Sequence, residues 1–459
     1  MHKQSNESGI IRLPKIAPHL RVDFVSRGAA NAGKALMVTS PYDQDYCRVY
    51  PASELGERVV SAVDGRTTAT KLIQRLTASS RHRHSDIADL LAILAKADIL
   101  ISGEYEMPDG QAALWLNIGY TPALVESVLS QSRIAVVNQA QSADCQQALV
   151  AMLNDLGLRV ASGNGNEPTL TAVVVDDYLQ ESLARVNRDY WQAGRAWLPV
   201  QLSGAVHQAG PVFNQAASEQ DASEQTEAKP HMARDFCWRC LAERIEHSRQ
   251  IEQAKYRQTG DAPRPAAAMH SAALRASAYR IALAIARHLL HAEVDGVAAS
   301  RFASSTWVSD QVADQSGWHL VNKNPVCAVC GEAPPSELAA IELDDAQTGT
   351  RYVSSGWRIK PPERTFSDYR HLNNAYTGVV DVLDDLQNPV DDSCFISESG
   401  NNIATRSDSV LMAMMSTRMR NAGKGTTPAS ARAGALCEAI ERYSTSLHGN
   451  EIRKLARYR

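Results

Sequence analysis

Four of the eight cysteines form two pairs in which two residues separate the thiols, Cys237–Cys240 and Cys327–Cys330. Two thiolates at this spacing can bind one metal ion, and the glycine after the second pair, Gly331, permits a tight turn. If both pairs meet in the fold, they complete a closed tetrahedral zinc site with no open position for a substrate, so the metal is structural. A redox C-x-x-C motif or unrelated buried thiols are the alternatives.

A second candidate site lies near the end of the chain. Glu438 and Glu441 are three residues apart in a helical pattern, which places both carboxylates on one face. Such a pair can bind Mg²⁺ on nucleotide phosphates, and Lys424 with its flanking glycines could offer an ammonium and backbone N–H groups to the same anion. The alternative is a solvated helix with a Glu438–Arg442 ion pair, and spacing alone does not decide between them.

The middle of the chain predicts an α/β sheet without a nucleotide site. Ile134–Val137 and Ala172–Val175 are short apolar runs typical of buried parallel strands, and Ala148–Leu156 between them has helical spacing. No glycine follows the first strand at Asn138–Gln141, where a phosphate-binding loop would lie. Gly163–Gly165 precedes a strand and predicts a plain turn. We therefore expect a catalytically silent scaffold.

The N-terminal part contains three short extended runs, Arg21–Val25, Leu36–Ser40 and Cys47–Tyr50. Three helical patterns follow, with expected N-caps at Ser53, at Thr67 or Thr68, and at Ser85. Ile99–Ser102 is a further expected strand. This order predicts a winged helix-turn-helix.

The charge of the third of these helices favours a peptide partner over DNA. A recognition helix in the major groove needs Lys and Arg for phosphate contacts. Here Asp86, Asp89 and Asp98 stand against Lys96 alone, and the basic cluster at residues 81–84 lies just before the helix. An acidic helix beside a small sheet edge is better suited to binding a peptide by strand addition.

Composition excludes several classes of protein. The 459 residues are 44% hydrophobic and 21% charged with a net charge of −4, so no global field favours nucleic acid or an anionic membrane. We find no apolar run long enough to span a bilayer and no secretory core at the N-terminus. Eight cysteines are too sparse for a disulfide scaffold. We expect a cytoplasmic protein. Residues 214–230 are polar and predict a flexible loop, and His270–His291 predicts a long helix.

Several stretches resemble the thiazole/oxazole-modified microcin cyclodehydratases, in which a ThiF-like (ubiquitin-activating-enzyme-like) domain is fused to a YcaO-type domain. RDFCWRCLAER and NPVCAVCG resemble the zinc knuckles of the ThiF-like domain, and WLPVQLSGAVHQAGPVF, residues 197–213, is similar to its W-L-P-V…G-P-x-F stretch. GKGTTPASARAGALCEAIERYS resembles the opening signature of YcaO domains, with Glu438 to Ser444 as the E-A-x-E-R-Y-S core.

The resemblance implies an α/β multi-domain chain. A winged-helix domain for leader-peptide recognition spans residues 1–107, a ThiF-like scaffold with the Cys₄ zinc site spans 108–348, and the N-terminal part of an α+β YcaO domain spans 349–459. Such enzymes bind the leader of a ribosomally made precursor peptide. Their YcaO domain uses ATP and Mg²⁺ to phosphorylate the hemiorthoamide formed when a Cys, Ser or Thr side chain attacks the preceding amide, and loss of phosphate leaves an azoline. The implied site residues are Glu438, Glu441 and Lys424 for Mg–ATP, and Cys47, Tyr50, Leu90 and Leu94 for the leader peptide.

The chain also departs from that pattern. A YcaO domain needs several hundred residues, of which this sequence supplies about 100, and His371–Gly378 differs from the S-P that often precedes the T-G. We therefore expect that this chain alone does not form azolines. Its expected partners are the precursor peptide and either the remainder of a YcaO domain or a separate YcaO protein, with a homodimer possible and with no DNA or membrane. The alternatives are a ThiF-class adenylating enzyme that activates a carboxylate and a DNA-binding regulator.

Overall fold

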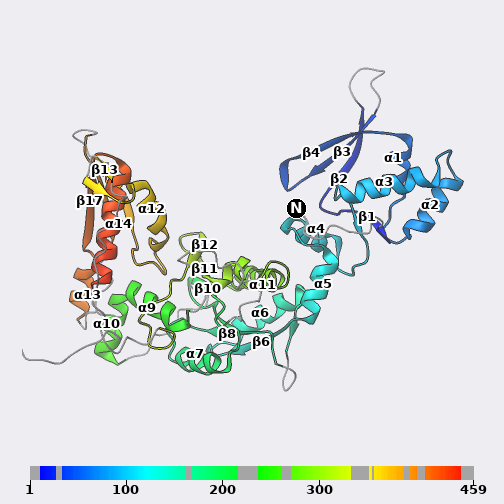
Figure 1. Ribbon diagram of the computed structural model, residues 1–459. Coiled ribbons are helices and arrows are strands. Elements are labelled where there is room, and N and C mark those ends of the chain that lie inside the picture. Colours follow the sequence, from blue (N-terminus) through cyan, green and yellow to red (C-terminus); the bar gives the residue numbers. More distant parts are fainter. Residues whose placement is uncertain are drawn as a thin grey trace, which may run out of the picture. The chain divides into compact units, whose positions relative to one another are not determined.

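The computed structural model describes residues 11–26, 34–161, 167–214, 236–260, 270–331, 351–353, 356–386, 393–400 and 409–445 (Figure 1). The chain divides into two compact units, Met1–Gln131 and Ser132–Arg459, and each is described by itself. Gly163–Gly165 and all but the first residue of the 214–230 segment lie outside the described residues, so those two predictions stay untested.

The first unit contains two small antiparallel sheets. One has the order β2-β3-β4, with β2 at Arg21–Ser26, β3 at Lys34–Ser40 and β4 at Asp43–Pro51, which confirms the three expected strands. The expected late strand is β5, Leu100–Ser102. It pairs with β1, Pro14–Ile16, which the sequence did not predict because three residues carry no readable periodicity.

Three helices follow the larger sheet, α1 (Glu54–Ala62), α2 (Ala69–Ala78) and α3 (His84–Lys96). Ser53 caps α1 and Thr68 caps α2, as expected. The prediction that Ser85 caps α3 is wrong. The N-cap is Arg83, whose backbone N–H donates to Asp86 Oδ2 at 3.1 Å, so the carboxylate three residues into the helix fixes its start. Two more helices, α4 (Asp109–Ile118) and α5 (Pro122–Gln131), complete this unit.

The second unit is organised around a seven-stranded mixed sheet of order β12-β11-β10-β9-β8-β6-β7. The strands are β6 (Arg133–Asn138), β7 (Arg159–Val160), β8 (Leu170–Val175), β9 (Trp197–Gln201), β10 (Val206–Ala209), β11 (Ser305–Asp310) and β12 (Gln315–Leu320). Strands β7, β6, β8 and β9 are parallel, and β10 to β12 are antiparallel. All six residues of β8 are buried, as its uninterrupted apolar run predicts.

The described helices that accompany this sheet are α6 (Asp144–Asp155), α7 (Ser182–Ala193), α9 (Trp238–Ser248), α10 (Gln250–Thr259) and α11 (Ser271–Val294). Helices α6 and α11 confirm the two helices expected here, and they pack against each other. Val173 and Val175 of β8 share one buried cluster with residues of α7 and α9. Because side chains alternate along a strand, this cluster covers one face of the sheet.

The C-terminal part of the second unit has a three-stranded antiparallel sheet, β15 (Leu383–Leu386), β16 (Phe395–Gly400) and β17 (Arg420–Gly425). A short hairpin, β13 (Arg351–Val353) and β14 (Gly356–Arg358), and helices α12 (Pro362–Tyr369) and α13 (Val410–Ser416) precede the last helix, α14 (Pro428–Ser444). Thr427 caps α14. The helix packs against β16 and β17. Over the described part of the chain, no helix is both long and apolar enough to cross a membrane.

Candidate functional site

The four cysteines of the two C-x-x-C pairs meet in one place. Their ligand atoms all lie within 4.8 Å of one another, with Cys237 Sγ 3.7 Å from Cys327 Sγ and Cys240 Sγ 3.4 Å from Cys330 Sγ. Disulfide bonds would bring sulfurs to about 2 Å. Four thiolates bound to one zinc ion lie about 3.8 Å apart, because the Zn–S bond is about 2.3 Å. The cluster therefore has a geometry that could bind a metal, and its donor set suits zinc.

Local structure explains how each pair reaches this point. Cys237 is the N-cap of α9, and Cys240 lies in the first turn of that helix. The other pair lies in a tight loop in which the Gly331 N–H donates to Cys327 O at 2.8 Å. A Cβ atom at Gly331 would overlap the backbone of Cys327, so this position requires glycine. The Asn324 N–H also donates to Cys240 Sγ at 3.4 Å, which fastens the two pairs together.

The cluster is part of the hydrophobic core. Cys237 and Cys240 are fully buried and Cys327 nearly so, in a cluster with Trp197, Phe213 and other apolar side chains. Hydrogen bonds from the neighbouring thiols, that of Cys237 foremost, hold the pKa of the Cys327 thiol well below its usual value. This shift favours the thiolate, which is the form that binds metal. A metal here would fasten α9 to the loop that follows β12, and four thiolate ligands would leave no coordination position for a substrate.

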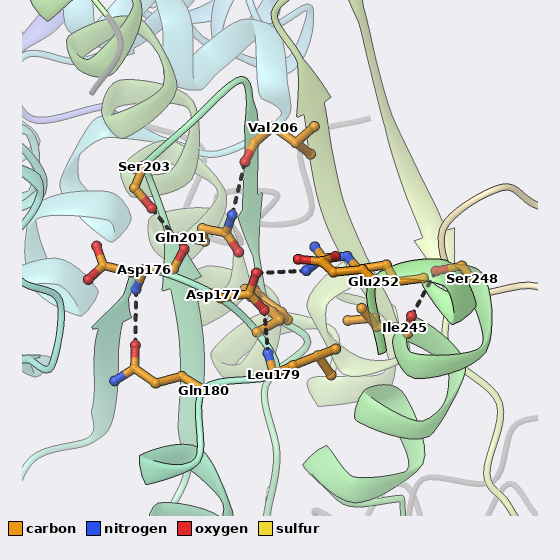
Figure 2. Close-up of polar contacts among 12 residues, drawn as sticks. Asp176, Asp177, Leu179, Gln180, Gln201, Ser203, Val206, Ile245, Ser248 and Glu252 are labelled. Carbon is orange, nitrogen blue, oxygen red and sulfur yellow. Dashed lines mark hydrogen bonds and ion pairs between the residues drawn. The ribbon is translucent and has the colours of Figure 1, made fainter. Parts of the chain in front are cut away.

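The place where a nucleotide would bind the parallel sheet is the edge between β6 and β8. Strand order reverses there, since the chain leaves β6 for β7 on one side and returns to β8 on the other. Ligands of open α/β sheets bind beyond the carboxyl ends of the strands at such a point. In this protein, Asp176 and Asp177 follow β8, and Ser203 follows β9 (Figure 2).

Protein side chains already occupy the backbone donors at this edge. The Gln141 N–H donates to Asp176 Oδ2 at 2.7 Å, and the Ala140 N–H donates to Asn138 Oδ1 at 3.1 Å. Asp177 accepts from the Leu179 N–H at 2.7 Å (Figure 2). It also accepts from the Arg249 guanidinium at 2.7 Å. A carboxylate thus lies where a phosphate would need N–H groups, and like charges disfavour the anion. This geometry agrees with the missing glycines after β6.

Both C-terminal glutamates lie on α14 as expected, but among the described residues only Glu438 forms an ion pair. Arg442 Nη2 lies 2.7 Å from Glu438 Oε1, which is the ion pair that the alternative interpretation named. Glu441 is exposed and forms no ion pair within the described ranges. The proposed Mg–ATP role of both residues stays a prediction.

Lys424 and its flanking glycines end β17 and pair with β16, so a strand precedes α14 here. Their proposed contact with the nucleotide stays a prediction. A Cβ atom at Gly423 would overlap backbone atoms of α14, so this glycine faces the helix and permits its close approach. Since side chains alternate along a strand, Lys424 faces away from α14.

An apolar pocket of about 80 Å³ lies in the first unit between the three-stranded sheet, α1 and α3. Three of the four residues assigned to the leader peptide, Tyr50, Leu90 and Leu94, line this pocket. Phe24, Leu36 and Tyr50 oppose one another across β2, β3 and β4, so they present one face of the sheet. Ile93 of α3 also lines the pocket and is 58% exposed.

Cys47, the fourth assigned residue, does not line the pocket. It lies on β4 three residues from Tyr50, so its side chain is on the opposite face of the sheet, where it is exposed. In the sheet order β2-β3-β4, however, β4 is an edge strand. Its outer backbone groups are placed to pair with an added strand next to the pocket.

Sequence reasoning missed the contact that joins α9 to α14. The Arg244 guanidinium lies 4.4 Å from the centroid of the Tyr443 ring, and the His247 ring packs edge-on against it at 6.2 Å. Helix α9 also contains Cys240, so the same helix contributes to the cysteine cluster and contacts α14. The sequence signal that could have pointed to this contact is the place of Tyr443 in the E-A-x-E-R-Y-S stretch.

Comparison with known proteins relates the fold of this chain to that of heterocyclases. Residues 422–459 match the YcaO cyclodehydratase family, described as ATP- and Mg²⁺-binding. A heterocyclase in complex with substrate and cofactor aligns over 96% of this chain with a TM-score of 0.78 and 23% identity, and the heterocyclase TruD aligns over 96% with 0.67 and 21%. At these identities the likeness shows the fold.

The alignments cover 55% and 53% of those two proteins, so this chain spans about half the length of the heterocyclases it matches. *E. coli* MccB aligns over 72% of this chain with a TM-score of 0.38 and 11% identity, a likeness too weak to support an argument. Comparison with curated proteins finds no match.

Proposed function

We propose that this chain binds the leader of a ribosomally made precursor peptide and presents the following residues for ATP-dependent cyclodehydration of Cys, Ser or Thr to azolines. The observation that carries this proposal is the apolar pocket between the sheet and α3, next to the edge strand β4. An extended peptide can add a strand to β4 with its backbone while alternate apolar side chains enter the pocket.

The surroundings of the pocket support a peptide over DNA. Arg83, from the basic cluster before α3, lies 3.6 Å from Asp86 and so shares its charge with a carboxylate. Ile93 presents an apolar side chain where a DNA-binding helix would need a cation. We assign residues 1–107 as a winged helix-turn-helix for recognition.

In this proposal the middle of the chain is a ThiF-like scaffold that zinc stabilises and that does not adenylate. Support comes from the closed four-cysteine geometry and from the switch point of the sheet, where Asp176 accepts from the Gln141 N–H and Asn138 accepts from the Ala140 N–H. Residues 349–459 contribute the beginning of a YcaO domain, where Glu438 and Glu441 would bind Mg²⁺ on ATP. Their carboxylate oxygens suit Mg²⁺, which usually keeps several waters and the nucleotide phosphates as its other ligands.

Fluorescence anisotropy tests the proposal with the whole chain and the labelled leader of a short precursor encoded beside its gene. We expect micromolar or tighter binding that ATP and Mg²⁺ do not change. Ile93→Asp should weaken binding at least about tenfold, because a charge in an apolar pocket loses its hydration. Tyr42→Asp is the matched control, since Tyr42 is an apolar residue 72% exposed in the same unit and does not line the pocket. Equal affinities of the two variants would contradict the assigned site.

The second candidate function is a ThiF-class adenylating enzyme, which the α/β sheet alone would permit. ATP–pyrophosphate exchange dependent on a carboxylate substrate would support this function. We expect no exchange, because the Gln141 and Ala140 N–H groups already have acceptors within the protein.

A further inference from the structure

A second pocket, of about 190 Å³, lies between α11 and the β11–β12 hairpin of the second unit. Its lining combines three arginines, Arg280, Arg287 and Arg301, with two tryptophans, Trp307 and Trp318. None of these residues lines the apolar pocket of the first unit or belongs to the cysteine cluster. The pocket therefore needs an explanation of its own.

The fold brings these side chains together from three separate elements. Arg280, Leu283 and Arg287 lie three and four residues apart along α11, so they share one face of the helix, and the two arginines are about 10 Å apart along its axis. Trp307 and Trp318 are directly opposite on the antiparallel pair β11–β12, so both rings are on the same face of the sheet. Arg301 begins the short 3₁₀ helix Arg301–Ala303.

Within the described ranges, no carboxylate pairs with the arginines of this pocket. None of the three arginines forms an ion pair with any residue that the structure describes, whereas Arg239 and Arg249 of the same unit lie 2.7 Å from carboxylates. His291, which also lines the pocket, lies 3.2 Å from Asp295 through its ring Nδ1. The Arg301 guanidinium lies 5.9 Å from the Trp318 ring centroid, which orients it along the aromatic wall.

We propose that this pocket binds an organic oxyanion, a phosphate or carboxylate group attached to an aromatic or similarly flat apolar group. Guanidinium groups bind both oxyanions through paired N–H bonds, and three of them favour a doubly charged group. The two indole rings and Leu283 offer an apolar wall for the attached ring.

This chemistry could come from a free phosphate ester, such as a nucleotide, or from the C-terminal residue of a peptide with an aromatic side chain. Both present an oxyanion next to a flat apolar group. The proposal is independent of leader binding, because the two pockets belong to different units of the chain.

Isothermal titration calorimetry of the whole chain tests the proposal with phenyl phosphate, inorganic phosphate and phenol. We expect phenyl phosphate to bind at least about tenfold more tightly than either half of the molecule alone. Arg287→Ala should weaken phenyl phosphate binding about tenfold, because a charge-assisted hydrogen-bonded pair is lost. Arg275→Ala is the matched control, since Arg275 is an exposed arginine on the same helix and does not line the pocket.

Two further ligands distinguish the source of the oxyanion. Tighter binding of adenosine monophosphate than of *N*-acetylphenylalanine would assign a phosphate ester, and the reverse, with no binding of *N*-acetylphenylalaninamide, would assign a peptide C-terminus. A Trp318→Leu variant tests the aromatic wall separately and should weaken phenyl phosphate while leaving inorganic phosphate unchanged. No binding of any ligand at millimolar concentration, or equal affinities of Arg287→Ala and Arg275→Ala, would overturn the proposal.

Discussion

The chain contains two motifs of the same spacing whose outcomes in the fold differ. Cys237 and Cys240 are three residues apart, and so are Glu438 and Glu441. The cysteines converge with a second pair from a distant loop in the core. The glutamates lie on the outside of α14, and one of them pairs with Arg442. Equal spacing therefore led to a closed four-donor site in one region and to a solvated helix face in the other.

The difference lies in what the rest of the fold contributes. The cysteine pairs are fixed by a helix N-terminus, by a loop that requires Gly331 and by the Asn324 N–H. At α14 the described residues supply no third donor, and Lys424 faces the other side of its sheet. A pair of ligands three residues apart predicts a site only when other elements deliver the remaining donors. Each prediction below separates a buried, fixed group from an exposed one.

The largest effect is expected for Cys240→Ser. This change removes one of the four proposed zinc ligands and leaves the other three thiols of the buried cluster without it. We expect bound zinc to be lost and stability to fall by at least about 4 kcal/mol, since metal binding and folding are coupled. Metal analysis and thermal unfolding measure both quantities.

Cys437→Ser is the matched control for this prediction, because Cys437 is an exposed cysteine on α14 outside the cluster. It should leave zinc content and melting temperature unchanged. Full zinc content in Cys240→Ser would contradict a four-cysteine site.

The second prediction concerns His288, a buried polar group of α11. Its Nδ1 lies 2.8 Å from Ser300 Oγ, and burial, with a smaller contribution from His291, lowers its pKa from 6.5 to about 4. The folded state therefore favours the neutral imidazole of His288, whereas in the unfolded chain this imidazole binds a proton more readily. Stability from this group is complete above pH 6.5 and is lost as the pH falls toward 4, by about 3 kcal/mol in total.

Zinc release at low pH would add to this loss, so the measurement is a comparison with His288→Gln, which cannot titrate. Chemical unfolding from pH 7 to pH 4 should show a steeper decline in the unmodified chain than in the variant. Parallel profiles for the two proteins would show that His288 does not bind its proton in this range.

A smaller effect is expected where α14 contacts α9. Tyr443→Ala removes the ring against which Arg244 and His247 pack, and we expect a loss of about 2 kcal/mol, less than for a fully buried aromatic residue. Tyr443→Phe keeps the ring and should be close to the unmodified chain. Thermal unfolding and protease resistance of the C-terminal part measure the effect. Equal losses in both variants would assign the contact to the hydroxyl group instead.

The sequence was informative where local rules and packing agree. The C-x-x-C pairs, the caps at Ser53, Thr68 and Thr427, and the buried run of β8 each follow from residue type and short-range spacing. The start of α3 was misplaced by the prediction because the Asp86 carboxylate reaches back to the Arg83 N–H, a contact that competes with an ordinary serine cap.

Other features depend on which distant elements meet, and local patterns do not carry that information. The sequence suggested that Gly423 could offer its N–H to an anion, and the fold adds a packing reason for this glycine, the close approach of α14 to β17. The arginine–tryptophan pocket joins residues from Arg280 to Trp318 with no motif, so it became visible only in the fold.

The smallest effect is expected at the glutamates themselves. Glu438→Gln breaks one partly exposed ion pair with Arg442 and should cost less than about 1 kcal/mol, and Glu441→Gln should change stability by less than about 0.5 kcal/mol. Chemical unfolding in low and high salt checks this, because an exposed ion pair weakens as salt screens it. A loss above about 2 kcal/mol in Glu441→Gln would mean that its carboxylate, like the cysteines, is fixed by the fold. If stability is unchanged, any decrease in Mg–ATP binding by either variant results from the lost carboxylate itself. The same test is impossible at the cysteines, because removing a metal-binding thiol there also destabilises the fold.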